Sequence, residues 1–204
     1  MTTTPSTERG AAGGVKARLD AIVREYHQRG DVPRLVEQLA RLAESSPTAE
    51  LVLAVEPFRE MHEVAGPLFE VIVAREPDDA KALVALANAY WLSGRGPEAV
   101  GELASRAISA DPTNRGAWHL WALSESSPRR RVQRWEQVTT RFPSDELAKA
   151  NLADNAASLA GAENDPVALK LAISTYEALL TTAQHPPQVA ALEKALTTLR
   201  NWSV

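Results

Sequence analysis

The stretch that most constrains this chain is residues 80–112, AKALVALANAYWLSGRGPEAVGELASRAISADP. Apolar side chains recur there at spacings of 0, 3, 4 and 7, at Leu83, Leu86, Ala87 and Tyr90. This spacing predicts one face of a helix, and the glycines that follow predict its end. Pro97 then suits the first turn of a second helix, which Pro112 terminates. Because a lone helical hairpin cannot bury both of its apolar faces, we expect similar hairpins beside it.

The N-terminal part of the chain supplies two further hairpins. Residues 15–28 repeat the spacing with Leu19, Ile22, Val23 and Tyr26. A break at Gly30 then precedes a second helix, which Pro47 ends. The next copy is less regular, with a short helix whose predicted buried residues are Ala49, Val52 and Leu53 and whose Glu56 stands where the other copies have Tyr. Its partner helix is predicted at about 63–75, with a start that Pro67 delays.

Beyond the central hairpin the sequence predicts two more hairpins and a final helix. Asn114 can cap a helix that carries Trp118 and Trp121, and Pro128 opens a helix with Val132, Trp135 and Val138 facing inward. The fifth hairpin is predicted to consist of two helices, over residues 144–161 and 165–180. A single amphipathic helix over 187–202 is predicted to cap the last exposed core. The total is eleven helices.

Composition supports an all-α fold and narrows the classes of partner. Aromatic residues make up only 5% of the chain, and no segment alternates convincingly as a strand. A net charge of -4 argues against a nucleic-acid binder, because phosphate contacts need a basic surface. The absence of cysteine excludes disulfides and thiolate zinc sites. Residues 1–14 are predicted to form a disordered tail and 15–202 the folded domain, with no signal peptide or membrane span and a cytoplasmic location.

The repeated pattern resembles that of tetratricopeptide repeat (TPR) proteins. The closing prolines, at positions 47, 77, 112 and 143, lie about 30–35 residues apart, close to the period of that repeat. The central copy matches the motif at Leu83, Leu86, Ala87, Tyr90, Gly94, Ala99, Leu103 and Pro112. Other copies depart from it, with Glu56 and Glu125 in place of Tyr and with Arg131 where a small residue is usual. The resemblance implies a right-handed α-solenoid of about five degenerate hairpins plus a capping helix. It also implies a concave groove lined by the first helix of each pair.

A second stripe of the central helix is predicted to face this groove. It consists of Lys81, Val84, Asn88 and Trp91, at spacings of 0, 3, 7 and 10. Arg24 and His27 from the first hairpin and His119 from the fourth are predicted to join it. A large aromatic on an accessible face is a typical binding anchor, so Trp91 is the residue of most interest. The alternative is that Trp91 packs against a neighbouring helix as part of the core.

Three consecutive cations form a second candidate site. Arg129, Arg130 and Arg131 follow Pro128 in the first turn of a helix, where the helix dipole disfavours positive charge. One interpretation is that an acidic partner segment docks on them. The other is that Glu125 or acidic residues of the preceding hairpin neutralise them, or that water solvates them.

No catalytic, cofactor-binding or metal-binding motif accompanies these features. The histidines at positions 27, 62, 119 and 185 lie in different hairpins, and none has metal-ligand spacing. Some members of the resembled family clamp a chaperone's terminal carboxylate with Lys and Asn side chains. That set is incomplete here, because Val84 stands where a Lys would help and Asp20 and Arg24 occupy the first-hairpin places.

The sequence therefore predicts a non-enzymatic scaffold or adaptor that binds a peptide or a folded protein through its groove. Two other roles remain open. One is a structural protein that assembles with copies of itself, and the other is an assembly or regulatory subunit of a larger enzyme or secretion complex.

Overall fold

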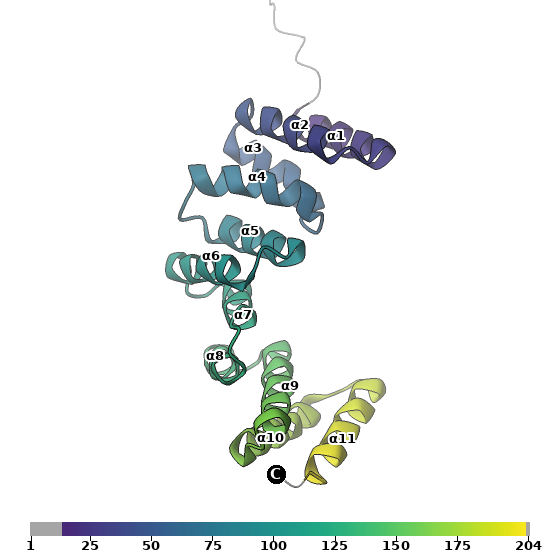
Figure 1. The fold of residues 1–204 in the computed structure, drawn as a ribbon, viewed down its shortest axis with the longest axis vertical. Coiled ribbons are helices and arrows are strands. Elements are labelled where there is room, and N and C mark those ends of the chain that lie inside the picture. The colour runs from purple at the N-terminus through teal and green to yellow at the C-terminus, as the bar shows by residue number, and fades with distance from the viewer. Residues whose placement is uncertain (1–13, 203–204) are drawn as a thin grey trace, which may run out of the picture. The chain divides into compact units, whose positions relative to one another are not determined.

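The computed structural model describes residues 14–202, and these residues form eleven α-helices, one short 3-10 helix and no strand (Figure 1). The helices are α1 (Val15–Arg29), α2 (Val32–Glu44), α3 (Thr48–Val55), η1 (Glu56–Phe58), α4 (His62–Arg75), α5 (Ala80–Ser93), α6 (Pro97–Ala110), α7 (Arg115–Leu123), α8 (Pro128–Arg141), α9 (Glu146–Glu163), α10 (Pro166–Thr182) and α11 (Pro186–Arg200). The prediction of an all-α helical repeat is confirmed. The predicted tail lies, apart from Gly14, outside the described residues.

Side-chain caps and left-handed glycines set the helix boundaries. The Asn114 side chain accepts a hydrogen bond from the backbone N–H of Ala117, as its predicted capping role requires. Four other helices have an aspartate N-cap of the same kind: Asp31, Asp79, Asp145 and Asp165. Gly30 and Gly94 end α1 and α5 with φ values of 66° and 69°. Glycine adopts this conformation without the Cβ clash that other residues incur, so both hairpins can turn tightly.

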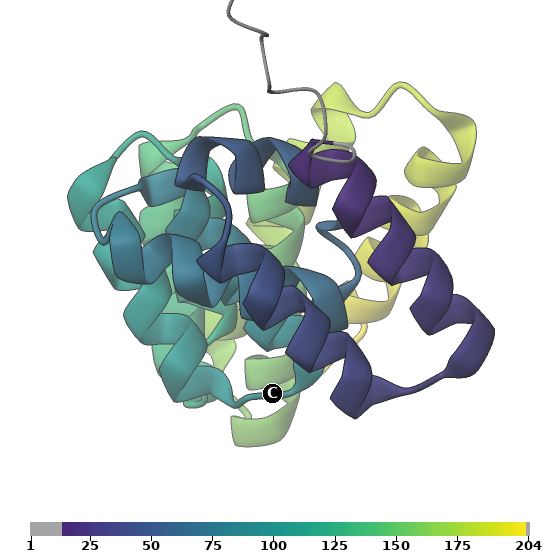
Figure 2. The same ribbon diagram turned by 90° about the horizontal axis from the view of Figure 1, so that it is seen from above.

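The chain divides into two compact units, Met1–Gly96 and Pro97–Val204. In unit 1, which contains α1 to α5, α1 packs against both α2 and α3, and α4 packs against α2, α3 and α5. The first two hairpins thus pack against each other through both of their helices, as in a repeat array, whereas α5 packs on α4 at the end of the unit. Figure 2 shows the turn that joins α1 and α2. A single domain over 15–202 stays a prediction.

Unit 2, which contains α6 to α11, packs each helix against the next one in the chain. Its core is built around Trp135, whose side chain is fully buried among residues of α7, α8, α9 and α10. Val132 and Val138 are buried with it, so the predicted inward face of α8 is confirmed. At the end of the unit, α11 buries Leu192, Leu196 and Leu199, as expected of a capping helix.

The predicted register of the second hairpin is wrong by two residues. The buried residues of α3 are Leu51, Ala54 and Val55, whereas Leu53 is 74% exposed and Val52 is only partly buried. Phe58 follows Leu51 by seven positions, so Phe58 and not Glu56 occupies the place of Tyr. Pro57 converts the last turn to the 3-10 helix η1, which still brings a partly buried Phe58 to that place.

The predicted delay of α4 is also wrong. The helix begins at His62 and contains Pro67 as its sixth residue. Proline at this position removes one backbone hydrogen bond to the carbonyl of Glu63. Burial of Val64 and Leu68 on either side of Pro67 offsets that loss.

None of the helices within residues 14–202 combines the length and the apolar character needed to cross a bilayer.

The corrected register of α3 makes a testable prediction. Leu51→Ala should lower the free energy of unfolding by about 2–5 kcal/mol, because it removes a fully buried side chain and leaves a cavity. Leu53→Ala, the matched control on the same helix, should change it by less than about 0.5 kcal/mol, because Leu53 is exposed. Urea denaturation followed by circular dichroism measures both. A larger loss in Leu53→Ala would restore the register predicted from sequence.

Candidate partner-binding face

In unit 1 the first helices of the three hairpins present residues at matching offsets from their buried stripes. Counted from Leu19, Leu51 and Leu83, the positions one, five and eight residues later lie, within each helix, at the same angle from the buried stripe of α1, α3–η1 and α5. We call these positions, together with Lys81, the α1–α3–α5 face. They are Asp20, Arg24, His27, Val52, Glu56, Arg59, Val84, Asn88 and Trp91. Figure 1 labels the three helices.

Trp91 is the largest apolar side chain of this face, and it is 44% exposed. The adjacent Leu92 is exposed to a similar extent, and Leu53 lies exposed on α3. The core of α5 is formed instead by Leu83, Leu86 and Ala87. Val84 and Asn88 are partly buried beside that core. The α1–α3–α5 face therefore offers accessible apolar surface that the fold of unit 1 does not cover.

Polar contacts hold the end of α5 that carries Trp91. The Tyr90 hydroxyl donates to Glu70 of α4 at 2.9 Å, and Arg95 pairs with the same carboxylate at 3.0 Å. The Arg95 guanidinium also lies over the Tyr90 ring, 4.5 Å from its centroid. Burial and the bond to Glu70 raise the pKa of Tyr90, so the hydroxyl stays a donor at neutral pH.

The charges of this face do not cancel. Asp20 pairs with Lys16 at 3.2 Å, and Glu56 pairs with Arg59 at 3.1 Å. Arg24 and Lys81 are exposed and have no ion pair with any described residue. His27 is also exposed, with its ring 6.1 Å from that of Tyr26.

In unit 2, His119 has an intramolecular role. Its Nε2 lies 2.7 Å from Oδ2 of Asp145, and its ring meets Trp135 edge to face, with 5.3 Å between centroids. The side chains of His119 and Asp145 are only 15% and 5% exposed. Asp145 also caps α9 through the N–H of Ala148. Burial alone would raise the pKa of Asp145, but the bonds from Ala148 and His119 outweigh it and lower the pKa.

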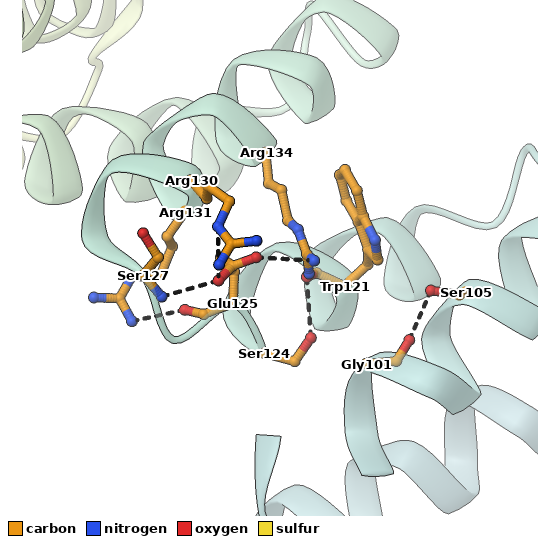
Figure 3. A network of polar contacts seen from close by, with 9 residues as sticks. All are labelled: Gly101, Ser105, Trp121, Ser124, Glu125, Ser127, Arg130, Arg131 and Arg134. Atoms are coloured by element: carbon orange, nitrogen blue, oxygen red, sulfur yellow. Dashed lines mark hydrogen bonds and ion pairs between the residues drawn. The ribbon is translucent and has the colours of Figure 1, made fainter. Parts of the chain in front are cut away.

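A buried carboxylate organises the turn between α7 and α8 (Figure 3). Glu125 is only 7% exposed and accepts hydrogen bonds from the Ser127 backbone N–H at 2.9 Å and from Arg134 at 3.0 Å. Arg134 also donates to the carbonyl of Trp121 and stacks 4.4 Å from the centroid of its ring. The bond from Ser127, followed by the arginine charges, lowers the pKa of Glu125 despite its burial.

All three predicted cations have partners within unit 2. Arg129 pairs with Glu163 and with Asp165, at the turn between α9 and α10. Arg130 is 71% exposed and lies 3.8 Å from Glu125.

Arg131 completes this set from the same turn of α8. It donates to Asn155 of α9 and to the carbonyl of Glu125. The three arginines thus link α8 to the turn between α7 and α8 and to the turn between α9 and α10. Glu125 neutralises part of their charge, as the second interpretation of the sequence expected. Docking of an acidic partner there stays a prediction.

α6 approaches the end of α7 closely at Gly101. A Cβ on Gly101 would lie 2.9 Å from the Ser124 hydroxyl oxygen, so a larger residue would force the Ser124 side chain to shift. A hollow of about 270 Å³ opens beside this contact, lined by Glu98, Glu102, Ser105, Ser124, Glu125, Ser126 and Arg134 among others. No group of three or more His, Asp or Glu within residues 14–202 is arranged as a metal site.

Sequence reasoning missed part of the α1–α3–α5 face. Arg59 and Val52 were hidden because the register of α3 was shifted, which placed Val52 in the core. The signal that identifies them is the spacing of Leu51, Ala54, Val55 and Phe58. Leu92 is not one of the face positions, but it lies exposed next to Trp91, and the sequence pattern did not single it out because only every third or fourth residue of the stripe was followed.

The Glu125 network predicts a large effect of a single substitution. Glu125→Ala should lower the free energy of unfolding by about 2 kcal/mol or more, because it leaves the partly buried Arg134 without its counter-charge. Glu136→Ala, on the exposed side of α8, is the control and should change the free energy of unfolding by less than about 0.5 kcal/mol. Equal losses in the two variants, measured by urea denaturation, would contradict a structural role for Glu125.

The lowered pKa values predict how stability depends on pH. A carboxyl group whose pKa is lower in the folded state stabilises the fold above its unfolded pKa, and this contribution is lost as the pH falls through the folded value. The ordinary values are 4.5 for Glu125 and 3.8 for Asp145. The free energy of unfolding should therefore be level from pH 7 to about 5 and should fall below about pH 4.5. Asp145→Asn should be less stable at pH 7 and should fall less steeply in acid. An unchanged slope would show that Asp145 does not contribute.

The known structures with a similar fold include those of three proteins. They are MamA (TM-score 0.58, 14% identity, over 84% of this chain and 98% of that one), PilF of Pseudomonas aeruginosa (0.58, 14%, 91% and 86%) and TTC0263, a thermophilic TPR protein of Thermus thermophilus (0.52, 14%, 92% and 100%). No protein-family model and no curated protein matches the sequence. At these identities the likeness is one of fold. By that fold, the chain is an all-α helical-repeat protein, similar to these three structures, one of which is described as a TPR protein.

Proposed function

We propose that this protein is a non-enzymatic scaffold whose partner, a peptide or a segment of a folded protein, lies along the α1–α3–α5 face. The fold is one that serves in general as a scaffold for protein interactions. The binding residues in this proposal are Arg24 and His27 on α1 and Lys81, Val84, Asn88 and Trp91 on α5. His119 is the further binding residue that the sequence predicts, in unit 2.

The observation that carries the proposal is the exposure of Trp91. An indole on the surface adds little to stability, whereas burial of a tryptophan by a partner contributes about 2 kcal/mol or more to binding. Trp91 is held in place from its own helix, because Tyr90 and Arg95 are both bonded to Glu70. Asn88, three residues earlier on the same side, can bond the backbone of an extended segment.

A role without catalysis agrees with the chemistry of the face. Its charged groups are two ion pairs and two cations, and they include no nucleophile with an adjacent base. The buried pair of His119 and Asp145 is used to cap α9 and to pack against Trp135. We propose a cytoplasmic location for the protein on the grounds given by its sequence, since cysteine is absent.

The exposed Arg130 extends the proposal to unit 2. Its ion pair with Glu125 is long, at 3.8 Å, and it is the most accessible of the three consecutive arginines. An acidic partner segment could reach Arg130 without displacing the contacts of Arg129 and Arg131. We propose Arg130 as a contact site of its own within unit 2.

The test uses the full chain as bait in a pulldown from its native cells, with mass spectrometry to identify the partner. Trp91→Ala should weaken binding of that partner by about 30-fold, because it removes about 2 kcal/mol, and Asn88→Ala should also weaken it. Trp202→Ala is the matched control, since Trp202 is exposed to a similar extent in unit 2. Melting temperatures should shift by only a few degrees.

Two results would contradict the proposal. Intact affinity in both Trp91→Ala and Asn88→Ala would show that the partner binds elsewhere. A large loss of stability in Trp91→Ala would show that the indole is a packing residue. Light scattering on the purified chain tests assembly with copies of itself, and co-purification of a multi-subunit complex tests the role of assembly or regulatory subunit.

A further inference from the structure

The α1–α3–α5 face has a positive surplus on a chain that is negative as a whole. The chain carries a formal net charge of -4. On this face, however, both carboxylates are paired, Asp20 with Lys16 and Glu56 with Arg59. The two cations without an ion pair among the described residues, Arg24 and Lys81, therefore determine its sign.

The carboxylates nearest the two cations are already engaged. Asp79, two residues before Lys81, caps α5 and accepts hydrogen bonds from the backbone N–H groups of Lys81 and Ala82. Glu60 follows Arg59 in the turn after η1 and lies outside the rows that define the face. Glu25, next to Arg24, is already paired with Arg29 and Arg34 at 3.3 and 2.7 Å.

Apolar surface accompanies this charge. Trp91 and Leu92 are both more than two-fifths exposed at the end of α5, and Leu53 is exposed on α3. Two kinds of contact are thus available on the α1–α3–α5 face, the aromatic surface of Trp91 and separate cations, with Leu53 and Leu92 exposed at neighbouring positions. A partner that uses both must carry an apolar side chain and negative charges.

We infer, on the basis of the proposed function, that the partner is an acidic segment in which Asp or Glu residues flank a large apolar side chain. The apolar side chain packs against Trp91, and the carboxylates lie near Arg24 and Lys81. A basic segment would place like charges together, and a neutral one would leave both cations without a partner. Carboxylates near exposed cations also speed association at low salt.

The experiment selects ligands from a random library, so the identity of the natural partner is not needed. Random dodecapeptides displayed on phage are selected on the full wild-type chain, since twelve extended residues span about 40 Å, enough to cross several helices. The same library is selected on the double variant Arg24→Glu, Lys81→Glu and on Trp91→Ala. Lys194→Glu, which reverses an exposed cation on α11, is the control for net charge.

The reversed residues are suited to this test. Arg24 and Lys81 have no ion pair among the described residues to lose, and Lys81 lies in the first turn of α5, where a glutamate favours the helix dipole. Circular dichroism and melting curves confirm that each variant is folded.

We expect peptides selected on the wild type to be rich in Asp and Glu around an aromatic or aliphatic residue. Their affinity, measured by fluorescence anisotropy, should fall about 10-fold or more in the double variant and in Trp91→Ala, and it should be unchanged in Lys194→Glu. The double variant should itself select basic peptides. Added salt should weaken binding of the peptides selected on the wild type more strongly to the wild-type chain than to the double variant.

Other outcomes overturn the inference. Peptides without an acidic bias whose binding depends on Trp91 would overturn it and leave the proposed function in place. Peptides that bind all variants equally, or no enrichment on the wild type, would contradict both. Acidic peptides that bind Trp91→Ala as well as the wild type would overturn the apolar part, since charge alone would then account for them.

Discussion

Close packing through alanine is the constraint on which each hairpin depends. Fully or almost fully buried alanines lie in most helices of both units, among them Ala54, Ala87, Ala104, Ala122, Ala153 and Ala172. A methyl side chain lets two helices approach to the short end of the usual range of about 8–10 Å. With aromatic residues at only 5%, each hairpin has few large side chains to bury, so its stability depends on contacts with its neighbours. A larger residue at one of these positions would separate helices rather than fill a space.

Both units place a carboxylate, an arginine and an aromatic ring at the end of a hairpin's first helix, but they do so with different residues. The first helix of a hairpin ends at a position that is Tyr90 in α5 and Glu125 after α7. In both places a carboxylate, an arginine and an aromatic ring come together, with the guanidinium 4.5 Å from the Tyr90 ring and 4.4 Å from the Trp121 ring. Tyr90 takes its carboxylate from Glu70 of α4, whereas unit 2 provides the carboxylate at the tyrosine position itself.

This exchange gives a physical reason for the arginines at the start of α8. Cations in the first turn of a helix are disfavoured by its dipole. A carboxylate buried without a counter-charge costs more, by several kcal/mol. Arg130 and Arg134 provide charge beside Glu125, and Arg131 bonds its carbonyl. The unfavourable placement of these cations therefore follows from the glutamate that replaces tyrosine.

Much of the fold could be predicted from the sequence, because helix ends depend on local residues such as Asn114, Gly30 and Gly94. The register of α3 could not. The segment ELVLAV carries apolar residues at two competing spacings, and periodicity alone cannot choose between Leu51 and Leu53. The partners of Arg129 were equally out of reach, because Glu163 lies 34 positions away and is brought near only by the packing of α8 on α9.

The candidate residues of the two units differ in how fully the fold already uses them. In α7, His119 directly follows Trp118, the residue that corresponds to Leu83 of α5. His119 is bonded to Asp145 and packs on Trp135. In unit 1 the corresponding Val84 lies beside Asn88 and Trp91, where half-exposed apolar surface remains and where Arg24 and Lys81 have no ion pair among the described residues. A side chain such as Trp91 gains little from folding, because much of its apolar area stays in water. Its burial by a partner, as proposed above, would recover that area.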